Sequence, residues 1–251
     1  MATGSRQTGT GLDFTTAMGC AVVELRRYAL HSGARDTLIE LFDRELVETQ
    51  EAVGMQVLGQ FRDLDDPDAF VWLRGYRDMP TRGQALEAFY GGPVWERHKA
   101  AANATMVDST NVLLLRPANP SSGFALDTGR RPSPGATTIP PGMVTVTICR
   151  MAGSAGAFPS FFDHELAPAL RRAGADIVAS LATEHAPNNF PRLPVREDVE
   201  AFVWLSRFPD EATSARHAAR IDVSRAVADW TGAPPETWRL TPTSRSLLPG
   251  Y

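Results

Sequence analysis

The sequence lacks most features that would place it outside the ordinary globular proteins. Its 251 residues contain no apolar run near the roughly 18 residues that cross a membrane. Residues 1–18 lack the basic start and apolar stretch of a signal peptide, and we expect them to form a disordered leader. The net charge of −4 gives no basic footprint for nucleic acid. We therefore expect a cytoplasmic protein with neither a nucleic-acid nor a membrane partner.

Cysteines and metal-binding or nucleotide-binding motifs are also scarce. The two cysteines, Cys20 and Cys149, favour buried free thiols in a reduced compartment over a disulfide. The five histidines show no HxxxH, HxH or HExxH spacing, and no CxxC pair is present, so no metal site is predicted. Nucleophile-elbow motifs, phosphate loops and nucleotide fingerprints are missing too. We expect no cofactor; a haem bound by one of the histidines is the alternative.

The sequence does contain an internal repeat. Phe-Asp-Arg-Glu-Leu at Phe42–Leu46 returns as Phe-Asp-His-Glu-Leu at Phe162–Leu166, and Ala69–Leu73 returns unchanged at Ala201–Leu205. Two matches in the same order indicate two copies of one supersecondary unit. The second copy carries about 12 extra residues between its matches, and the prolines and asparagines of His185–Pro194 predict an inserted loop there.

Each copy has the pattern strand, helix, strand, strand, helix, strand, which is the ferredoxin-like βαββαβ order. In the first copy we expect strands at 21–30, 53–63, 69–76 and 111–116 and helices at 37–52, 86–90 and 93–104. In the second copy we expect strands at 143–150, 176–183, 201–208 and 237–241, and a helix from Pro159 that Pro168 kinks. The strand at 69–76 is apolar on both sides, so we expect both faces of its sheet to be buried. The face that the helices leave open in one copy should therefore pack against that of the other copy within the chain.

The connection between the copies is rich in proline, glycine and serine, which predicts a linker without a packed core. We therefore divide the chain into a leader (1–18), a first ferredoxin-like repeat (19–117), a linker (118–141), a second repeat (142–243) and a tail (244–251). The predicted fold class is α+β, with tandem ferredoxin-like repeats whose sheets form one barrel.

Several segments of the first copy resemble the NIPSNAP family. They are Glu24–Tyr28, Gln60–Asp63, Phe70–Arg74, Phe89–Trp95 and Leu113–Pro117. The resemblance covers about residues 21–117 and is weak in the second copy. It implies the dimeric α+β barrel superfamily, formed here within one chain, whose members include cofactor-free oxygenases, haem proteins, isomerases and ligand-binding proteins. The resemblance therefore implies no single reaction.

The first strand carries the candidate catalytic residues. Alternation places Glu24, Arg26 and Tyr28 on one face, with His31 at the end of the strand. Counted 120 positions on, the second copy has apolar residues there, namely Val144, Val146 and Ile148. We predict that Glu24 acts as a base, Arg26 as an anion clamp and Tyr28 as a hydrogen-bond donor. The alternative is a Glu24–Arg26 pair that only satisfies itself, because a buried charge is normally paired.

Aromatic residues are expected to line a substrate pocket beside this group. The candidates are Trp72, Phe89, Tyr90 and Trp95, with His98 one helical turn after Trp95. An ordinary core position is the alternative for each ring, and a surface position for His98. The Gly91-Gly92 pair before Pro93 breaks a helix and would let backbone approach a ligand.

Two classes of function follow from these residues. The first is a small-molecule enzyme of specialised metabolism that acts on an apolar or aromatic substrate by cofactor-free proton transfer, cyclisation, isomerisation or oxygenation. The second is a non-catalytic protein that binds a hydrophobic ligand or haem. A polar cluster in one copy only favours the enzyme. The expected partner is a small apolar or aromatic molecule, and a homo-oligomer is compatible with either class.

Overall fold

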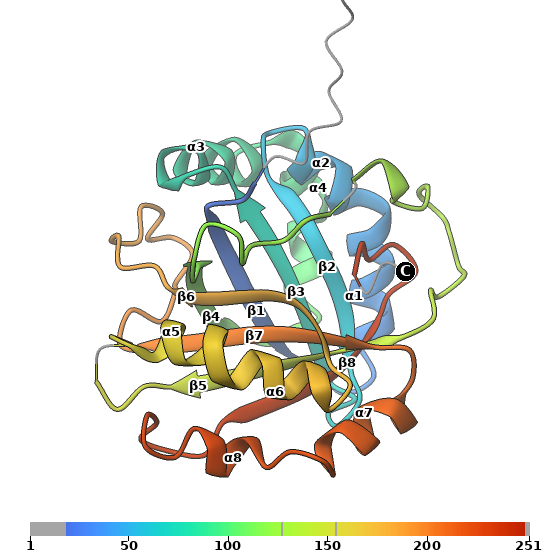
Figure 1. The fold of residues 1–251 in the computed structure, drawn as a ribbon. Helices are drawn as coiled ribbons and strands as arrows, with labels where there is room; N and C mark the ends of the chain where they lie inside the picture. The colour runs from blue at the N-terminus through green and yellow to red at the C-terminus, as the bar shows by residue number, and fades with distance from the viewer. Residues whose placement is uncertain (1–18, 127, 154, 249–251) are drawn as a thin grey trace, which may run out of the picture.

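Eight strands of the computed structural model close into a barrel to which both halves of the chain contribute (Figure 1). The structure describes residues 19–126, 128–153 and 155–248, so the expected leader at 1–18 lies outside the described residues. Around the barrel the strand order is β1-β3-β2-β8-β5-β7-β6-β4, and neighbouring strands are antiparallel. The mixed α/β barrel agrees with the expected fold class. That the two halves are copies of one unit remains a prediction, as do the domain boundaries.

The first half supplies four strands and four helices. The strands are β1 (Val22–Leu30), β2 (Gln56–Asp63), β3 (Ala69–Tyr76) and β4 (Met106–Pro117). The helices are α1 (Arg35–Leu41), α2 (Val47–Glu51), α3 (Met79–Tyr90) and α4 (Pro93–Asn103), with a π-helical turn, η1 (Phe42–Leu46), between α1 and α2. Helix α3 begins after Asp78, whose carboxylate accepts the Thr81 backbone N–H and so caps the helix.

The second half has the same alternation of strands and helices. Its strands are β5 (Met143–Arg150), β6 (Asp176–Thr183), β7 (Ala201–Phe208) and β8 (Glu236–Pro242). Its helices are α5 (Phe158–Phe161), α6 (Ala167–Arg172), α7 (Glu211–Ala218) and α8 (Val223–Ala226), with a π-helical turn, η3 (Phe162–Leu166), between α5 and α6. The short 3₁₀ helix η2 (Thr128–Arg130) lies in the connection between the halves.

The repeated Phe-Asp-x-Glu-Leu segment forms a π-helical turn in both halves. Pro168 is the second residue of α6, which follows η3 without a gap, and it does not end the helical run. Because η1 has the same turn without a proline, the widened turn does not depend on Pro168.

Three apolar cores hold the barrel and its helices together. The barrel interior combines residues of both halves, among them Val23, Leu73, Val146 and Leu205. A second core lies between the first-half strands and their helices, and a third lies between the second-half strands and theirs. Figure 1 shows α1–α4 around one side of the barrel and α5–α8 around the other. Every residue of β3 is buried, as its apolar pattern predicts.

Strand pairing corrects one sequence prediction. Arg26 lies opposite Trp72 on β3, and Thr147 lies opposite Trp204 on β7. The counterpart of Arg26 is therefore Thr147, 121 positions on (147 minus 26), and not Val146. A shift of one residue moves every side chain of a strand to the other face, which is why the expected counterparts face the barrel interior. The expected counterparts of Glu24, Arg26 and Tyr28 were the apolar residues Val144, Val146 and Ile148. The residues that occupy these positions are Thr145, Thr147 and Cys149.

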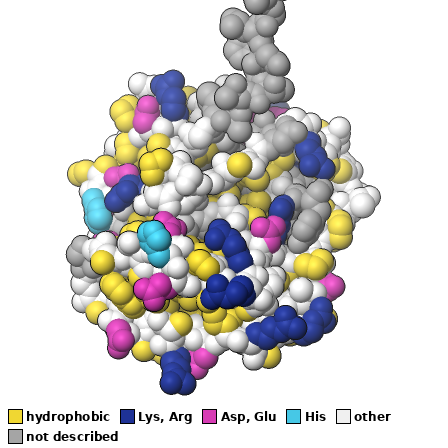
Figure 2. Space-filling model, viewed as in Figure 1, with side chains coloured by type: hydrophobic (Ala, Val, Ile, Leu, Met, Phe, Trp, Pro, Cys, Tyr) yellow, Lys and Arg dark blue, Asp and Glu magenta, His cyan; other side chains and the backbone are white. Residues whose placement is uncertain are grey.

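Both cysteines are buried free thiols, as expected. Burial raises the pKa of Cys20 to about 11 and that of Cys149 to about 12, so neither is a thiolate at neutral pH. Within the described ranges, no helix is long and apolar enough to span a bilayer. On the face in Figure 2, basic, acidic and apolar side chains are interspersed in small groups.

Candidate functional site

The first half encloses a small cavity between its sheet and its helices. The free space is about 30 Å³, enough for one or a few water molecules and too small for an aromatic ring unless the walls move. Of the predicted site residues, Tyr28, Trp72, Phe89, Tyr90 and Trp95 line it. The remaining lining residues are Leu38, Phe42, Leu46, Gln50, Ala102 and Met106.

Tyr90 is at the centre of the aromatic wall of the cavity. Its ring centroid lies 5.0 Å from that of Phe89 and 5.0 Å from that of Trp95, both in edge-to-face arrangements. On another side it stacks on Phe190 at 5.7 Å, with 22° between the ring planes. Phe190 belongs to the inserted loop, His185–Pro194. A segment of the second half therefore packs against the aromatic wall of the first-half cavity.

A fully buried ionic cluster lies beside the cavity. It consists of Glu24 and Arg26 on β1, Arg74 on β3 and Arg82 on α3, each with a side-chain exposure of 0%. Glu24 Oε2 accepts from Arg26 Nη1 at 2.7 Å and from Arg74 Nε at 2.8 Å, and Oε1 accepts from Arg82 Nε at 2.7 Å. Glu24 and Arg74 are direct partners across the β1–β3 pair. One carboxylate thus faces three guanidinium groups, which leaves these four side chains with a net charge of +2.

Each guanidinium also binds at least one neutral group. Arg26 Nε donates to the Tyr28 hydroxyl at 2.9 Å, and Arg74 Nη1 donates to Gln50 Oε1 at 3.1 Å. Arg82 Nη1 donates to the inserted loop, to Asn188 Oδ1 at 3.0 Å and Asn189 Oδ1 at 2.7 Å. The inserted loop is therefore attached directly to the ionic cluster.

Several buried donors of this cluster have no partner among the described residues. The Nη2 atom of each of the three arginines is buried without a hydrogen-bond partner there, and the same holds for Trp72 Nε1 and the Tyr76 hydroxyl. A buried donor that stays unpaired costs about 1–3 kcal/mol, and more when it is charged. The cluster therefore has hydrogen-bonding capacity that its own side chains do not use.

The ionic cluster and the cavity share walls. The Arg26 Cζ atom lies 5.5 Å from the Tyr28 ring centroid, and Arg74 Cζ lies 5.0 Å from that of Trp72 and 5.9 Å from that of Tyr90. All three rings line the cavity. Cation–π attraction fixes the rings against the guanidinium groups. With the rings in these positions, they separate the cavity from two buried positive charges.

The surroundings of Glu24 are unfavourable for a base. Burial alone would raise the pKa of Glu24, but Arg74, Arg26 and Arg82 together outweigh it and hold the pKa well below its usual value. Both carboxylate oxygens already accept hydrogen bonds from arginine. Glu24 is thus ionised and occupied at neutral pH, so the geometry favours a charge-balancing role over proton abstraction.

Tyr28 is better placed to act on a ligand. Burial raises its pKa and outweighs the opposing effect of Arg26, so the phenol stays protonated at neutral pH. Its oxygen accepts from Arg26 Nε, which leaves the hydroxyl hydrogen available to a molecule in the cavity that Tyr28 lines. The predicted role of Tyr28 as a hydrogen-bond donor fits this geometry. The catalytic assignments of Glu24, Arg26, Tyr28 and His31 remain predictions.

The histidines lie away from the cavity. His31 is exposed after the end of β1, and His98 Nε2 lies 3.7 Å from Glu45 Oε2 on η1. No histidine is among the residues that line the cavity. The residues present therefore do not fit a histidine-ligated haem in this cavity. Within the described ranges, no group of three or more His, Cys, Asp or Glu residues could hold a metal ion.

The Gly91-Gly92 break has a local explanation. A Cβ atom on Gly91 would lie 3.0 Å from the Glu87 carbonyl oxygen, and one on Gly92 would lie 2.9 Å from that of Ala88. Glycine is therefore needed where α3 ends and α4 begins, irrespective of any ligand.

Sequence reasoning missed several residues of the site, namely Gln50, Arg74, Arg82, Asn188 and Asn189. Alternation along β3 puts Arg74 on the same face as Trp72, so that residue was predictable. Arg82 and Gln50 come from helices whose orientation depends on the packing. The inserted loop was recognised, but its position over the other half could not be derived from its composition.

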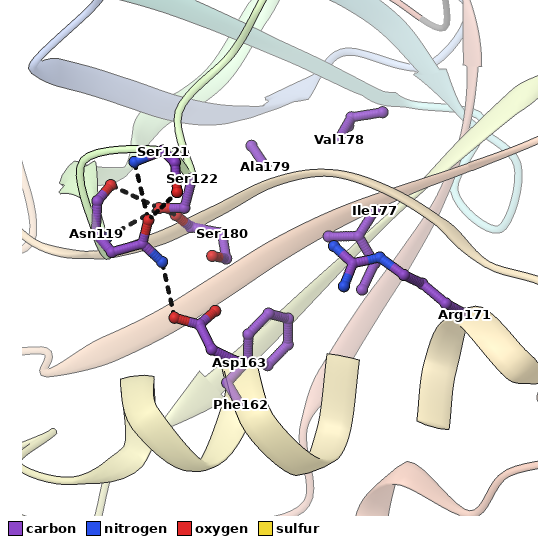
Figure 3. Close-up of a pocket in the computed structure, with 10 residues that line it drawn as sticks. All are labelled: Asn119, Ser121, Ser122, Phe162, Asp163, Arg171, Ile177, Val178, Ala179 and Ser180. Atoms are coloured by element: carbon purple, nitrogen blue, oxygen red, sulfur yellow. Dashed lines mark hydrogen bonds between the residues drawn. The ribbon is translucent and has the colours of Figure 1, made fainter. Parts of the chain in front are cut away.

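In the second half, the described residues that correspond to Glu24, Arg26 and Tyr28 are Thr145, Thr147 and Cys149. These positions therefore hold no comparable ionic group. It has instead a shallower polar pocket of about 140 Å³, shown in Figure 3. There Asn119 Nδ2 donates to Asp163 Oδ2 at 2.7 Å, and Arg171 lies on the opposite side (Figure 3). The two halves therefore differ in the chemistry between sheet and helices.

A pocket of about 490 Å³, larger and more open than the first-half cavity, lies over Asp43 of η1. Asp43 Oδ1 accepts from Gln60 Nε2 and Thr243 Oγ1, both at 3.3 Å. Asp43 is thus already held by the segment that follows β8. Burial raises its pKa.

The comparisons with known proteins concern family and fold. Residues 23–122 match the family model of NIPSNAP, which confirms the resemblance predicted for the first half. No curated protein matched the chain. The whole chain is similar to solved structures of a protein from Fusobacterium nucleatum and one from Lactobacillus acidophilus, both provisionally named monooxygenases, and of DyPB from Rhodococcus jostii.

These similarities cover nearly the full length of each chain. The Fusobacterium protein is 9% identical, with a TM-score of 0.58, over 90% of this chain and 93% of its own. The Lactobacillus protein is 11% identical, with a TM-score of 0.54, over 88% and 92%. DyPB is 10% identical, with a TM-score of 0.52, over 93% and 96%. At such identities the similarity establishes the fold and leaves the reaction open.

Proposed function

We propose that the protein is a small-molecule enzyme of specialised metabolism that acts on an apolar or aromatic substrate in the first-half cavity. The observation that carries the proposal is an aromatic-lined cavity directly against a buried polar cluster, with uncharged residues at the corresponding second-half positions. Aromatic walls bind apolar surface, and a few fixed polar groups orient the bound molecule.

Tyr28 is the residue that we assign to the chemistry. Its protonated hydroxyl would donate to a developing negative charge on the substrate, and Arg26 behind it would stabilise that charge through the shared hydrogen bond. Proton transfer, isomerisation, cyclisation or oxygenation would each use such a donor. The fold that the chain shares with two proteins provisionally named monooxygenases supports including oxygenation.

Binding without turnover is the second candidate. It is favoured by the state of Glu24, whose carboxylate is fully engaged by arginine and so cannot serve as a free base. The two candidates share the cavity and differ in whether the bound molecule changes.

A matched pair of tryptophan variants tests the cavity. Trp72 and Trp204 are each 2% exposed and lie at corresponding positions of β3 and β7. Of the two, Trp72 lines the cavity. We expect Trp72→Phe to weaken binding of indole or benzamide by about tenfold or more, and Trp204→Phe to leave it unchanged, as measured by calorimetric titration.

Equal effects of the two substitutions, or no binding of any small aromatic compound, would contradict the proposal. Tyr28→Phe then separates the two candidates, because loss of a catalytic donor lowers kcat by about a hundredfold or more. Mass spectrometry of the bound compound, incubated with the protein in air-saturated and in anaerobic buffer, detects turnover and any need for oxygen.

A further inference from the structure

We propose that the ligand of the first-half cavity is an organic anion, with a carboxylate or phosphate group bound by Arg26, Arg74 and Arg82 and an aromatic or apolar body held by the aromatic wall. This inference rests on the proposed function, because it names the substrate class of the same cavity.

The first argument is charge. Glu24 is the one acid that hydrogen-bonds the three arginines among the described residues, and all four side chains are fully buried. The other side chains bound to these guanidinium groups are the Tyr28 phenol, the Met55 thioether and the amides of Gln50, Asn188 and Asn189, which carry no charge. Buried charges are stable when they are paired. A ligand with one or two negative charges would pair those that Glu24 leaves uncompensated.

The second argument is hydrogen-bonding capacity. Each arginine has a buried Nη2 group without a partner in the described part of the chain, and Trp72 Nε1 adds another such donor nearby. All of these atoms donate and none accepts, so they match an acceptor-only group. Carboxylates and phosphates have this character and suit the planar fork of arginine.

The third argument is access. Arg82 is covered by Asn188 and Asn189 of the inserted loop, and Phe190 of the same loop stacks on Tyr90. These contacts join the loop to both the ionic cluster and the aromatic wall. The cavity of about 30 Å³ is too small for an aromatic acid while Tyr90 is in place. A movement of the loop would uncover Arg82 and release Tyr90, which would widen the cavity and open a path to Arg74 behind that ring.

The experiment compares isosteric probes on the intact protein at fixed ionic strength. Benzoate, phenyl phosphate and neutral benzamide are titrated by calorimetry. We expect the better of the two anions to bind about ten- to a hundredfold more tightly than benzamide, as charge-assisted hydrogen bonds predict. The preference between benzoate and phenyl phosphate tells which anionic group the site takes.

Arg26→Met and a control locate the anion. The variant keeps Glu24 paired with Arg74 and Arg82, and we expect the preference for the anion over benzamide to fall by about tenfold or more. Arg77→Met makes the same change of charge at a side chain that is 70% exposed, and it should leave the preference intact. If Arg26→Met does not fold, the comparison of the three probes on the unaltered protein still decides whether the site prefers an anion.

Three results would overturn the inference. Equal affinities of benzamide and the anions would refute the anion and leave the apolar cavity in place. If Arg77→Met lost as much of the preference for the anion as Arg26→Met, the anions would bind through the overall charge of the protein. Absence of binding by all three probes would refute both this inference and the proposed function.

Discussion

At the scale of single residues, the buried ionic cluster depends on Glu24, whose carboxylate is fully buried. The sequence predicted Glu24 as a base, with a Glu24–Arg26 ion pair as the alternative, and the structure has one carboxylate held by three arginines. Alternation along one strand predicts which side chains share a face, and it placed Glu24, Arg26 and Tyr28 together correctly. It could not predict Arg82, because that residue reaches the cluster from a helix whose position depends on packing.

Removal of the carboxylate charge should therefore be costly. Glu24→Gln leaves three buried guanidinium groups without a counter-charge, and we expect the free energy of unfolding at pH 7 to fall by about 3–5 kcal/mol. Urea unfolding measures this change. In contrast, Arg26→Met removes one of three like charges and should cost distinctly less. A Glu24→Gln protein as stable as the original would mean that the cluster is not paired as described.

The same carboxylate should give stability a defined pH dependence. The pKa of Glu24 in the folded protein lies well below its ordinary value of 4.5. Its contribution is therefore complete above about pH 4.5 and is lost as the pH falls through the lowered folded pKa. We expect the difference in stability between the original protein and Glu24→Gln to be constant from pH 5 to 8 and to shrink below pH 4.5. A constant difference down to pH 3 would contradict the assignment.

At the scale of elements, the inserted loop is the part whose role the sequence could not reveal. Its prolines and asparagines predicted a loop at His185–Pro194, but composition carries no information on which surface a loop covers. The strands were predictable, since the bounds at 143–150, 176–183 and 201–208 agree with β5, β6 and β7. The π-helical turns η1 and η3 were not, because a π turn has no simple periodic signal.

The attachment of the loop can be tested at Asn189. Its side-chain oxygen accepts from Arg82 Nη1, which also donates to Asn188, so Asn189→Ala leaves one N–H of a buried charged group without its acceptor. The substitution also removes the bond from Asn189 Nδ2 to the Met79 carbonyl. We expect a loss of about 1–3 kcal/mol in the free energy of unfolding. Asn119→Ala is the control, because its side-chain bonds to Asp163 and Ser121 are all exposed and the substitution should cost less than the loss of a bond to a buried charge. Equal losses would show that the loop does not depend on Arg82.

At the scale of the whole molecule, the barrel joins the halves through a shared interior and two short seams. Phe61–Asp63 of β2 pairs with Leu240–Pro242 of β8, and Leu115–Pro117 of β4 pairs with Leu181–Thr183 of β6. The βαββαβ pattern and the two-sided apolar strands predicted this closure. The correspondence between residues of β1 and β5 was predicted one position out. Such an error exchanges the two faces of a strand, because successive side chains point to opposite sides.

Either half alone should therefore be incomplete. A protein of residues 19–122 would expose the barrel-interior face of β1–β4 and two unpaired strand edges. We expect it to form dimers or larger aggregates in light scattering coupled to gel filtration, because such a face and such edges recruit another chain. A stable folded monomer of this half would contradict a core that depends on both halves.

The central claim is that an organic anion binds between the aromatic wall and the buried arginines. The most direct measurement is a crystal structure of the protein with 4-iodobenzoate, in which anomalous scattering locates the iodine. We predict an iodine peak among Phe89, Tyr90 and Trp95, with the carboxylate within hydrogen-bonding distance of Arg26 or Arg74. A peak only in the pocket over Asp43, or no peak at concentrations that saturate binding in solution, would contradict the claim.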